Sequence, residues 1–235
     1  MKTRLWLPVT VVIFLLLLAY ALFQVSNSRT FQFFGTLTAR VETDQKVVAL
    51  TFDDGPTDKT PEVLDIMDAL GVKASFFLIG AALEEHPVVG ERIAASGHEI
   101  GNHTYSHQRM YFKLPGFIQS EIERTDELIR RTGYQGQIHF RPPYSKKLFL
   151  LPLYLMQHNR RTIMVDVEAE TFARTGDSKE EMVERVLRNT RPGSIILLHP
   201  HSANDEPRKA LPEIVRKLQD RGFRFVTVSE LLAYQ

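Results

Sequence analysis

The chain has 235 residues, 43% of them hydrophobic, which is enough for one domain of about 200 residues with a full core. The formal net charge is +1, and lysines and arginines alternate with acids along the chain, which argues against nucleic acid as a partner. The absence of cysteine excludes disulfides and thiolate metal sites, so histidines and carboxylates are the available metal ligands.

The N-terminal segment differs from the rest of the chain. Residues 5–25 carry no charge, close to the roughly 20 residues that a helix needs to cross a bilayer, and Lys2 and Arg4 precede them. This pattern predicts a single-pass anchor in the inner or cytoplasmic membrane, with a cytoplasmic N-terminus and an exported, periplasmic or extracellular, domain. The small residues at 19–21 resemble a signal-peptidase site, so a cleaved signal peptide and a secreted domain are the alternative.

The chain is expected to divide into three parts. Residues 1–28 form the anchor or signal peptide, residues 29–44 a connector, and residues 45–235 the exported domain. Within that domain, short apolar runs predict strands at residues 47–52, 75–79, 98–102, 138–141, 162–167, 194–199 and 223–228.

Helical patterns lie between these runs. Residues 60–71 have Thr60 as the expected N-cap, Pro61 at the first helical position and Gly71 at the exit. Residues 177–189 begin with a capping box, Ser178 and Glu181. In residues 148–158, Pro152 predicts an irregular or broken helix. Strands that alternate with helices predict an α/β fold in which about seven parallel strands close, or nearly close, into a (β/α) barrel.

Ionisable residues stand at the ends of four predicted strands. Asp53 and Asp54 follow the first strand, His103 the third, while Arg141 and His199 end the fourth and sixth. Because active sites of such barrels lie at the carboxyl ends of the strands, we expect these side chains to meet at one rim.

His103 and His107 are four residues apart, which on a helical turn would let both imidazoles bind one cation. Thr104 stands where the metalloprotease motif has its glutamate, so the base must come from elsewhere. One of the two adjacent aspartates is expected to bind the metal and the other to take a proton. Such a site leaves coordination positions open, and its imidazoles favour one divalent zinc ion, with cobalt or nickel also suitable.

The segments "TFDDGP", "HTYSH", "RPPY" and "LLH", in that order, resemble the polysaccharide deacetylases of the NodB-homology group, carbohydrate esterase family 4. The likeness extends over residues 45–232. It implies a distorted (β/α) barrel and metal-dependent removal of acetyl groups from N-acetylated, sometimes O-acetylated, sugars.

The resemblance also implies a role for each motif residue. Asp53 would be the general base, held by Arg141, and His199 the general acid that protonates the leaving amine. The backbone amide of Tyr144 would stabilise the oxyanion, and Leu197 would line the pocket for the acetyl methyl group. The implied metal ligands are Asp54, His103 and His107.

One region departs from the family pattern. Family members commonly have a "DxxDW"-like segment whose aspartate orients the acid histidine and whose tryptophan lines the groove. This chain has "DVEAETF" there, so the partner of His199 stays open among Asp166, Glu168 and Glu170, with Phe172 near the place of the tryptophan. A further histidine, His201, is interpreted as a loop residue.

The main functional hypothesis is a metal-dependent hydrolase that removes N-acetyl groups from a glycan containing N-acetylhexosamine, such as peptidoglycan, a chitin-like polymer or an exopolysaccharide. One alternative is a membrane-associated deformylase or deacetylase of a lipid-linked amino sugar. Another is a catalytically inactive glycan-binding domain. The oligomeric state stays open.

Overall fold

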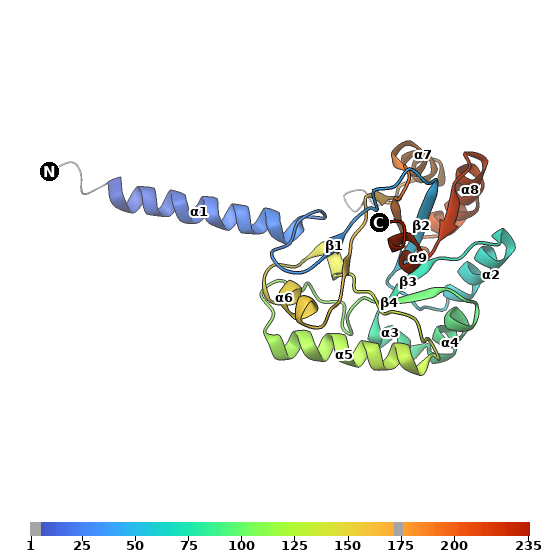
Figure 1. Ribbon diagram of the computed structural model, residues 1–235, viewed down its shortest axis with the longest axis horizontal. Coiled ribbons are helices and arrows are strands. Elements are labelled where there is room, and N and C mark those ends of the chain that lie inside the picture. The colour runs from blue at the N-terminus through green and yellow to red at the C-terminus, as the bar shows by residue number, and fades with distance from the viewer. Residues whose placement is uncertain (1–5, 172–175) are drawn as a thin grey trace.

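The computed structural model describes residues 6–171 and 176–235, and it consists of a parallel sheet wrapped by helices, with one long helix extending away from this body (Figure 1). The strands are β1 Leu37–Thr38, β2 Val47–Asp53, β3 Ser75–Leu78, β4 Glu99–Asn102, β5 Thr162–Ile163, β6 Val167–Glu168, β7 Ile195–Leu198 and β8 Arg224–Val226. The helices are α1 Trp6–Asn27, α2 Thr60–Leu70, α3 Gly80–Glu85, α4 Pro87–Ala95, α5 Pro115–Arg131, the 3-10 turn Pro143–Ser145, α6 Leu150–Gln157, α7 Lys179–Asn189, α8 Glu206–Asp220 and α9 Val228–Leu232.

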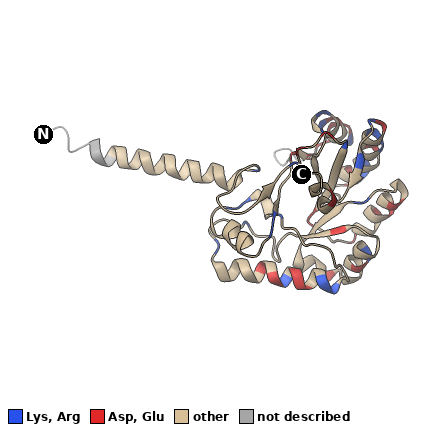
Figure 2. Ribbon diagram, viewed as in Figure 1, with Lys and Arg blue, Asp and Glu red and all other residues tan. Residues whose placement is uncertain are grey.

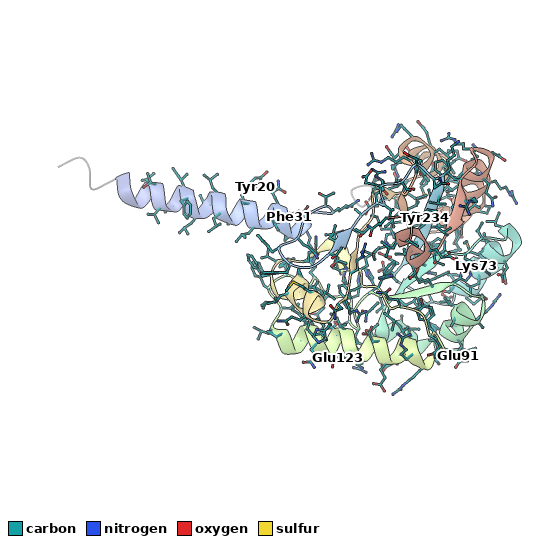
Figure 3. All side chains as sticks on the ribbon, viewed as in Figure 1. Tyr20, Phe31, Lys73, Glu91, Glu123 and Tyr234 are labelled. Carbon is teal, nitrogen blue, oxygen red and sulfur yellow. The ribbon has the colours of Figure 1, made fainter. Side chains whose placement is uncertain are left out.

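Helix α1 is the part of the chain that stands outside the body. Figure 2 shows no charged residue along it, whereas α5, α7 and α8 carry both signs of charge. Its segment Val9–Asn27 has a mean hydropathy of 2.4 and is 6% buried, so its side chains project into the surroundings, as around Tyr20 in Figure 3. Within the described residues it is the one helix long and apolar enough to cross a membrane, a test that a signal sequence also passes.

The sheet has the order β4-β3-β2-β7-β6, and all of its neighbouring strands are parallel. The first residues of β2 pair with β8, and later residues of β2 pair with β3. The segment predicted as a connector contributes β1, which pairs with β5.

Between β4 and β5 the barrel is closed by a single residue. Phe140 bridges Asn102 on one side and Thr162 on the other, so the strand predicted at 138–141 is reduced to an isolated bridge. The strand predicted at 162–167 is divided in two because its pairing partner changes. The first part, β5, pairs with β1, and the second part, β6, pairs with β7. At this crossing Asp166 N donates to Ile195 O (3.3 Å), and the Asp166 carboxylate accepts from Ile195 N (2.9 Å) and Ser194 Oγ (2.9 Å). These features produce the expected distorted (β/α) barrel.

Alternation along β2 determines which residues face the interior. Val48, Leu50 and Phe52 pack into the large cluster shared with the surrounding helices. Val47 and Ala49 belong to a second apolar cluster with residues of β5 and β7. Because side chains alternate along a strand, Thr51 and Asp53 point to this second side, and both are buried.

Helix boundaries follow the sequence in part. The Ser178–Glu181 capping box is formed, and Gly71 ends α2 with φ 64°. The N-cap of α2 is Lys59 rather than Thr60, whose hydroxyl instead accepts from Thr57 N at 2.9 Å. The predicted irregularity at Pro152 is wrong, because Pro152 lies in the first turn of α6, where a missing N–H removes no helical hydrogen bond.

Candidate active site

All eight predicted site residues line one cavity of about 500 Å³, a size common for ligand pockets. It opens at the carboxyl ends of the parallel strands, where the sequence predicted the site. The predicted residues in its wall are Asp53, Asp54, His103, His107, Arg141, Tyr144, Leu197 and His199.

Asp53 and Arg141 form a buried ion pair at the floor of the cavity. The Arg141 Nη1 atom donates to Asp53 Oδ1 at 2.6 Å and to Thr51 Oγ1 at 2.9 Å. The guanidinium also lies over the ring of Phe77, 3.9 Å from its centroid. Asp53 is 4% exposed and Arg141 3%, so each charge depends on the other for compensation.

Asp54 is directed toward two imidazoles. Its Oδ1 atom lies 3.0 Å from His107 Nε2 and 3.5 Å from His103 Nε2. Burial raises the pKa of Asp54, but hydrogen bonds and charge interactions with His103 and His107 outweigh it, so this pKa lies well below its usual value. The three potential ligand atoms lie within 4.8 Å of one another, as binding of one cation requires.

The loop that carries the two histidines is not helical, contrary to the expected helical turn. Thr104 and His107 have φ values of 67° and 54°, and Thr104 Oγ1 accepts from His107 N at 3.1 Å. Asn102 Oδ1 accepts from Thr104 N at 2.8 Å. This bend still brings the two rings together, with centroids 5.0 Å apart.

The orientation of His103 is set by a backbone carbonyl. Its Nδ1 lies 2.8 Å from the carbonyl oxygen of Arg141, which only accepts hydrogen bonds, so Nδ1 carries the proton in the neutral ring. Metal-binding histidines are commonly held in this way. In this neutral tautomer Nε2 faces Asp54 without a proton, as a cation shared by the two side chains requires, whereas the hydrogen bond that lowers the pKa of Asp54 needs the doubly protonated ring.

Backbone strain is concentrated around the cavity. Positive φ is uncommon for residues other than glycine and often marks functional sites. Five residues at the site adopt it: Asp54, Thr104, His107, Tyr144 and Ser145.

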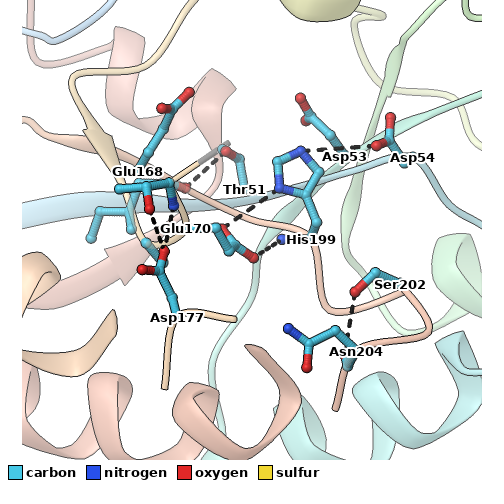
Figure 4. Close-up of polar contacts among 12 residues, drawn as sticks. Thr51, Asp53, Asp54, Glu168, Glu170, Asp177, His199, Ser202 and Asn204 are labelled. Carbon is cyan, nitrogen blue, oxygen red and sulfur yellow. Dashed lines mark hydrogen bonds and ion pairs between the residues drawn. The ribbon is translucent and has the colours of Figure 1, made fainter. Parts of the chain in front are cut away.

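His199 lies between two groups of carboxylates (Figure 4). Glu170 Oε1 accepts from His199 N at 2.7 Å, and Glu170 Oε2 lies 3.6 Å from His199 Nδ1. On the other side, His199 Nε2 lies 3.9 Å from Asp54 Oδ2. Burial lowers the pKa of His199, but the hydrogen bond and charge of Glu170, with the charges of Asp53 and Asp54, raise it to about 9.

Of the three acids that the sequence left open, Glu170 contacts His199. Asp166 bonds the start of β7, and Glu168 pairs with Arg29 at 2.6 Å. Phe172, expected near the place of the family's tryptophan, lies outside the described residues.

His201 lies in the loop between β7 and α8, as the sequence predicted, and its side chain is buried there. Its Nδ1 is 3.0 Å from Thr60 Oγ1, and burial lowers its pKa to about 4. A Cβ at Gly55 would lie 2.9 Å from the ring, so glycine is required for this close approach. In the sequence, the close spacing of His201 to His199 in the "HPH" segment was the signal that His201 lies near the site.

Sequence reasoning also missed the contribution of the end of α1 and the residues that follow it, 26–29. Asn27 and Arg29 line the cavity. The buried Lys147 holds this segment, because its backbone N donates to Ser26 O at 3.2 Å and its Nζ donates to Ser28 O. No short-range pattern indicates these contacts, which join residues more than one hundred positions apart.

Most of the chain is similar to known carbohydrate-modifying proteins. A model of the polysaccharide deacetylase family matches residues 40–161. The peptidoglycan-N-acetylglucosamine deacetylase of Bacillus cereus is 36% identical over 187 residues, which cover 78% of this chain and 67% of that protein. The bifunctional xylanase/deacetylase of Pseudobutyrivibrio xylanivorans is 34% identical over 207 residues, and the match covers 88% of this chain but 33% of that protein.

Solved structures lead to the same family. A crystal structure of a peptidoglycan N-acetylglucosamine deacetylase with a bound benzamide compound has a TM-score of 0.77 and 33% identity, and the match covers 82% of this chain and 91% of that one. The chain therefore belongs to the polysaccharide deacetylase family, as the resemblance of its motifs predicted.

Proposed function

We propose that this protein is a metal-dependent hydrolase that removes N-acetyl groups from a glycan containing N-acetylhexosamine. The observation that carries the proposal is the pair of adjacent aspartates in one cavity. Asp53 is held by Arg141, and Asp54 is directed at His103 and His107. The names of the relatives, which describe deacetylation of peptidoglycan, support the substrate class.

The residues fit one divalent ion held by Asp54, His103 and His107, because two imidazoles and a carboxylate converge within 4.8 Å. This donor set favours zinc, with cobalt or nickel as the next candidates. Such an ion polarises an acetyl carbonyl and makes water more acidic.

The chain's own residues supply the remaining chemistry. Asp53 takes a proton from the attacking water, and Arg141 keeps this carboxylate charged and oriented inside the barrel. As water adds to the acetyl carbon, the backbone N–H of Tyr144 donates to the developing oxyanion. His199 gives its proton to the sugar nitrogen as the C–N bond breaks, which releases acetate and the free amine. Leu197, 5% exposed, forms part of the apolar wall for the methyl group.

The proposed organisation follows the sequence. Residues 1–28 are an anchor or signal peptide, residues 29–44 a connector, and residues 45–235 the exported catalytic domain. Helix α1 supports a single-pass protein of the cytoplasmic membrane, by its length and hydropathy. A cleaved α1 would instead give a secreted domain. A deformylase or deacetylase of a lipid-linked amino sugar is the second candidate, favoured by the position of the cavity beside the end of α1.

The test is acetate release by the detergent-solubilised full chain, loaded with zinc, from N-acetylglucosamine oligomers and peptidoglycan fragments. We expect turnover by the parent, none after chelation, and a loss of at least about 10³-fold in Asp53→Asn, within the range for removal of a general base. Asp58→Asn is the matched control, because its side chain is 78% exposed on the same loop. Glycan binding by the parent without turnover on any acetylated or formylated amino sugar would favour the inactive binding domain instead.

A further inference from the structure

Two cationic side chains in the cavity wall have no ion-pair partner among residues 6–171 and 176–235. Arg109 and Lys146 both belong to its wall, and neither forms a salt bridge with any residue in the described ranges. Arg29, in the same wall, differs in that Glu168 neutralises it at 2.6 Å.

The two cations lie on the side of the cavity that holds the histidines. The guanidinium of Arg109 is 4.6 Å from the centroid of the Tyr144 ring, and this ring packs against His107 at 4.7 Å. Lys146 lies two residues after Tyr144 in the chain. Burial lowers the pKa of Lys146, and the positive charge of Arg109 lowers it further.

The carboxylates of the cavity wall already have other partners. Asp53 pairs with Arg141, Asp54 with the two imidazoles, and Glu168 with Arg29. The charge on Arg109 and Lys146 is therefore available to a bound molecule. Guanidinium and ammonium groups bind carboxylates and phosphates through charge-assisted hydrogen bonds.

We propose that Arg109 and Lys146 form a subsite for an anionic group, a carboxylate or a phosphate, carried by the acetylated sugar substrate. The proposal rests on the proposed deacetylase function and narrows its substrate class to charged amino sugars. The Nζ atom of Lys146 also lies 5.2 Å from the ring centroid of Phe23 near the end of α1. The subsite therefore opens beside the apolar helix, where a phosphate at a membrane surface would reach it as readily as a carboxylate on a polymer.

The experiment measures kcat/KM for acetate release by the zinc-loaded full chain on two matched sets of substrates. One set is neutral N-acetylglucosamine oligomers, and the other has the same sugars with a carboxylate ether, a 1-phosphate, or a 1-phosphate linked to a lipid. The variants are Arg109→Gln, Lys146→Gln and the double variant. Arg216→Gln on α8 is the control, because it removes an exposed positive charge that does not line the cavity.

We expect the parent to prefer charged substrates. In the double variant, the ratio of charged to neutral kcat/KM should fall by about 10- to 150-fold, the loss expected for charge-assisted hydrogen bonds. Arg216→Gln should keep the parental ratio. Whether the carboxylate, the soluble phosphate or the lipid phosphate gives the highest value identifies the source of the anion.

A parent that prefers neutral oligomers, or a ratio unchanged in the double variant, would overturn the subsite. Absence of acetate release from every substrate would count against the deacetylase function alone. In that case, calorimetric titration of N-acetylglucosamine 1-phosphate into the parent and the double variant tests the subsite directly. Tighter binding by the parent supports it, and equal binding overturns it.

Discussion

Replacing Glu170 with glutamine should move the alkaline limb of the pH–rate profile to lower pH. The substitution keeps the size of the side chain but removes the carboxylate that lies 3.6 Å from His199 Nδ1. As a general acid, His199 works in its protonated form, so activity is present below its pKa and is lost as the pH rises through it. In the parent this pKa is raised to about 9.

The size of the shift follows from the geometry. At 3.6 Å and an effective dielectric constant of about 20, two unit charges interact by roughly 4–5 kcal/mol, an upper value because solvent and the glutamine dipole offset part of it. Opposite charges at such distances move a pKa by about 1–3 units. The alkaline limb of the variant should therefore fall between about pH 6 and pH 8.

The assay is kcat/KM for acetate release across pH 5 to 11 at saturating zinc. Glu168→Gln is the control, because Glu168 pairs with Arg29 and should leave the limb in place. An equal loss of rate at every pH in Glu170→Gln, with no displacement of the limb, would refute the assignment of Glu170 as the partner of the acid histidine.

Three further predictions concern stability, each measured by urea unfolding of the detergent-solubilised chain. Arg141→Met should destabilise the protein by about 3–5 kcal/mol because it leaves Asp53 buried and unpaired, while adding Asp53→Leu should restore much of this loss; purely additive effects would contradict the coupling. Burial lowers the pKa of Lys147 to about 8, so the folded state binds fewer protons and parental stability should rise between pH 8 and 10.5. That rise should be absent in Lys147→Met, and its persistence would argue against a buried ammonium. Zinc at about 100 times its Kd should stabilise the parent by about 2.7 kcal/mol but not His107→Ala, and equal stabilisation of both would place the metal elsewhere.

Much of the site is predictable from the sequence because parallel strands impose an order on it. When strands run in parallel, their carboxyl ends share one rim, so Asp53, His103, Arg141 and His199 meet although they are far apart in the chain. Alternation along β2 then directs Asp53 to the interior, where Arg141 reaches it.

The parts that the sequence left open depend on contacts that no local pattern encodes. Which of Asp166, Glu168 and Glu170 contacts His199 is determined where the chain changes its pairing partner between β5 and β6. This short segment is irregular, so its sequence has no helical or strand periodicity from which the side-chain directions could be predicted. The approach of His103 to His107 depends on a bend with positive φ rather than on helical spacing. Arg29 lines the cavity and pairs with Glu168, although the two residues are more than one hundred positions apart in the sequence.

The end of α1 is attached directly to the cavity wall, which fixes the distance of the active site from this helix. Because α1 ends at Asn27, and Asn27 and Arg29 already line the cavity, there is no flexible tether whose span would grow with length. An enzyme held by α1 in a bilayer would therefore hydrolyse substrate only within a thin layer beside the lipid headgroups, so its turnover of an immobile substrate would depend on how much of that substrate lies within this layer. Cleavage after Ala21 would release the domain from that layer while leaving the Ser28 carbonyl on Lys147 and the wall of the cavity intact.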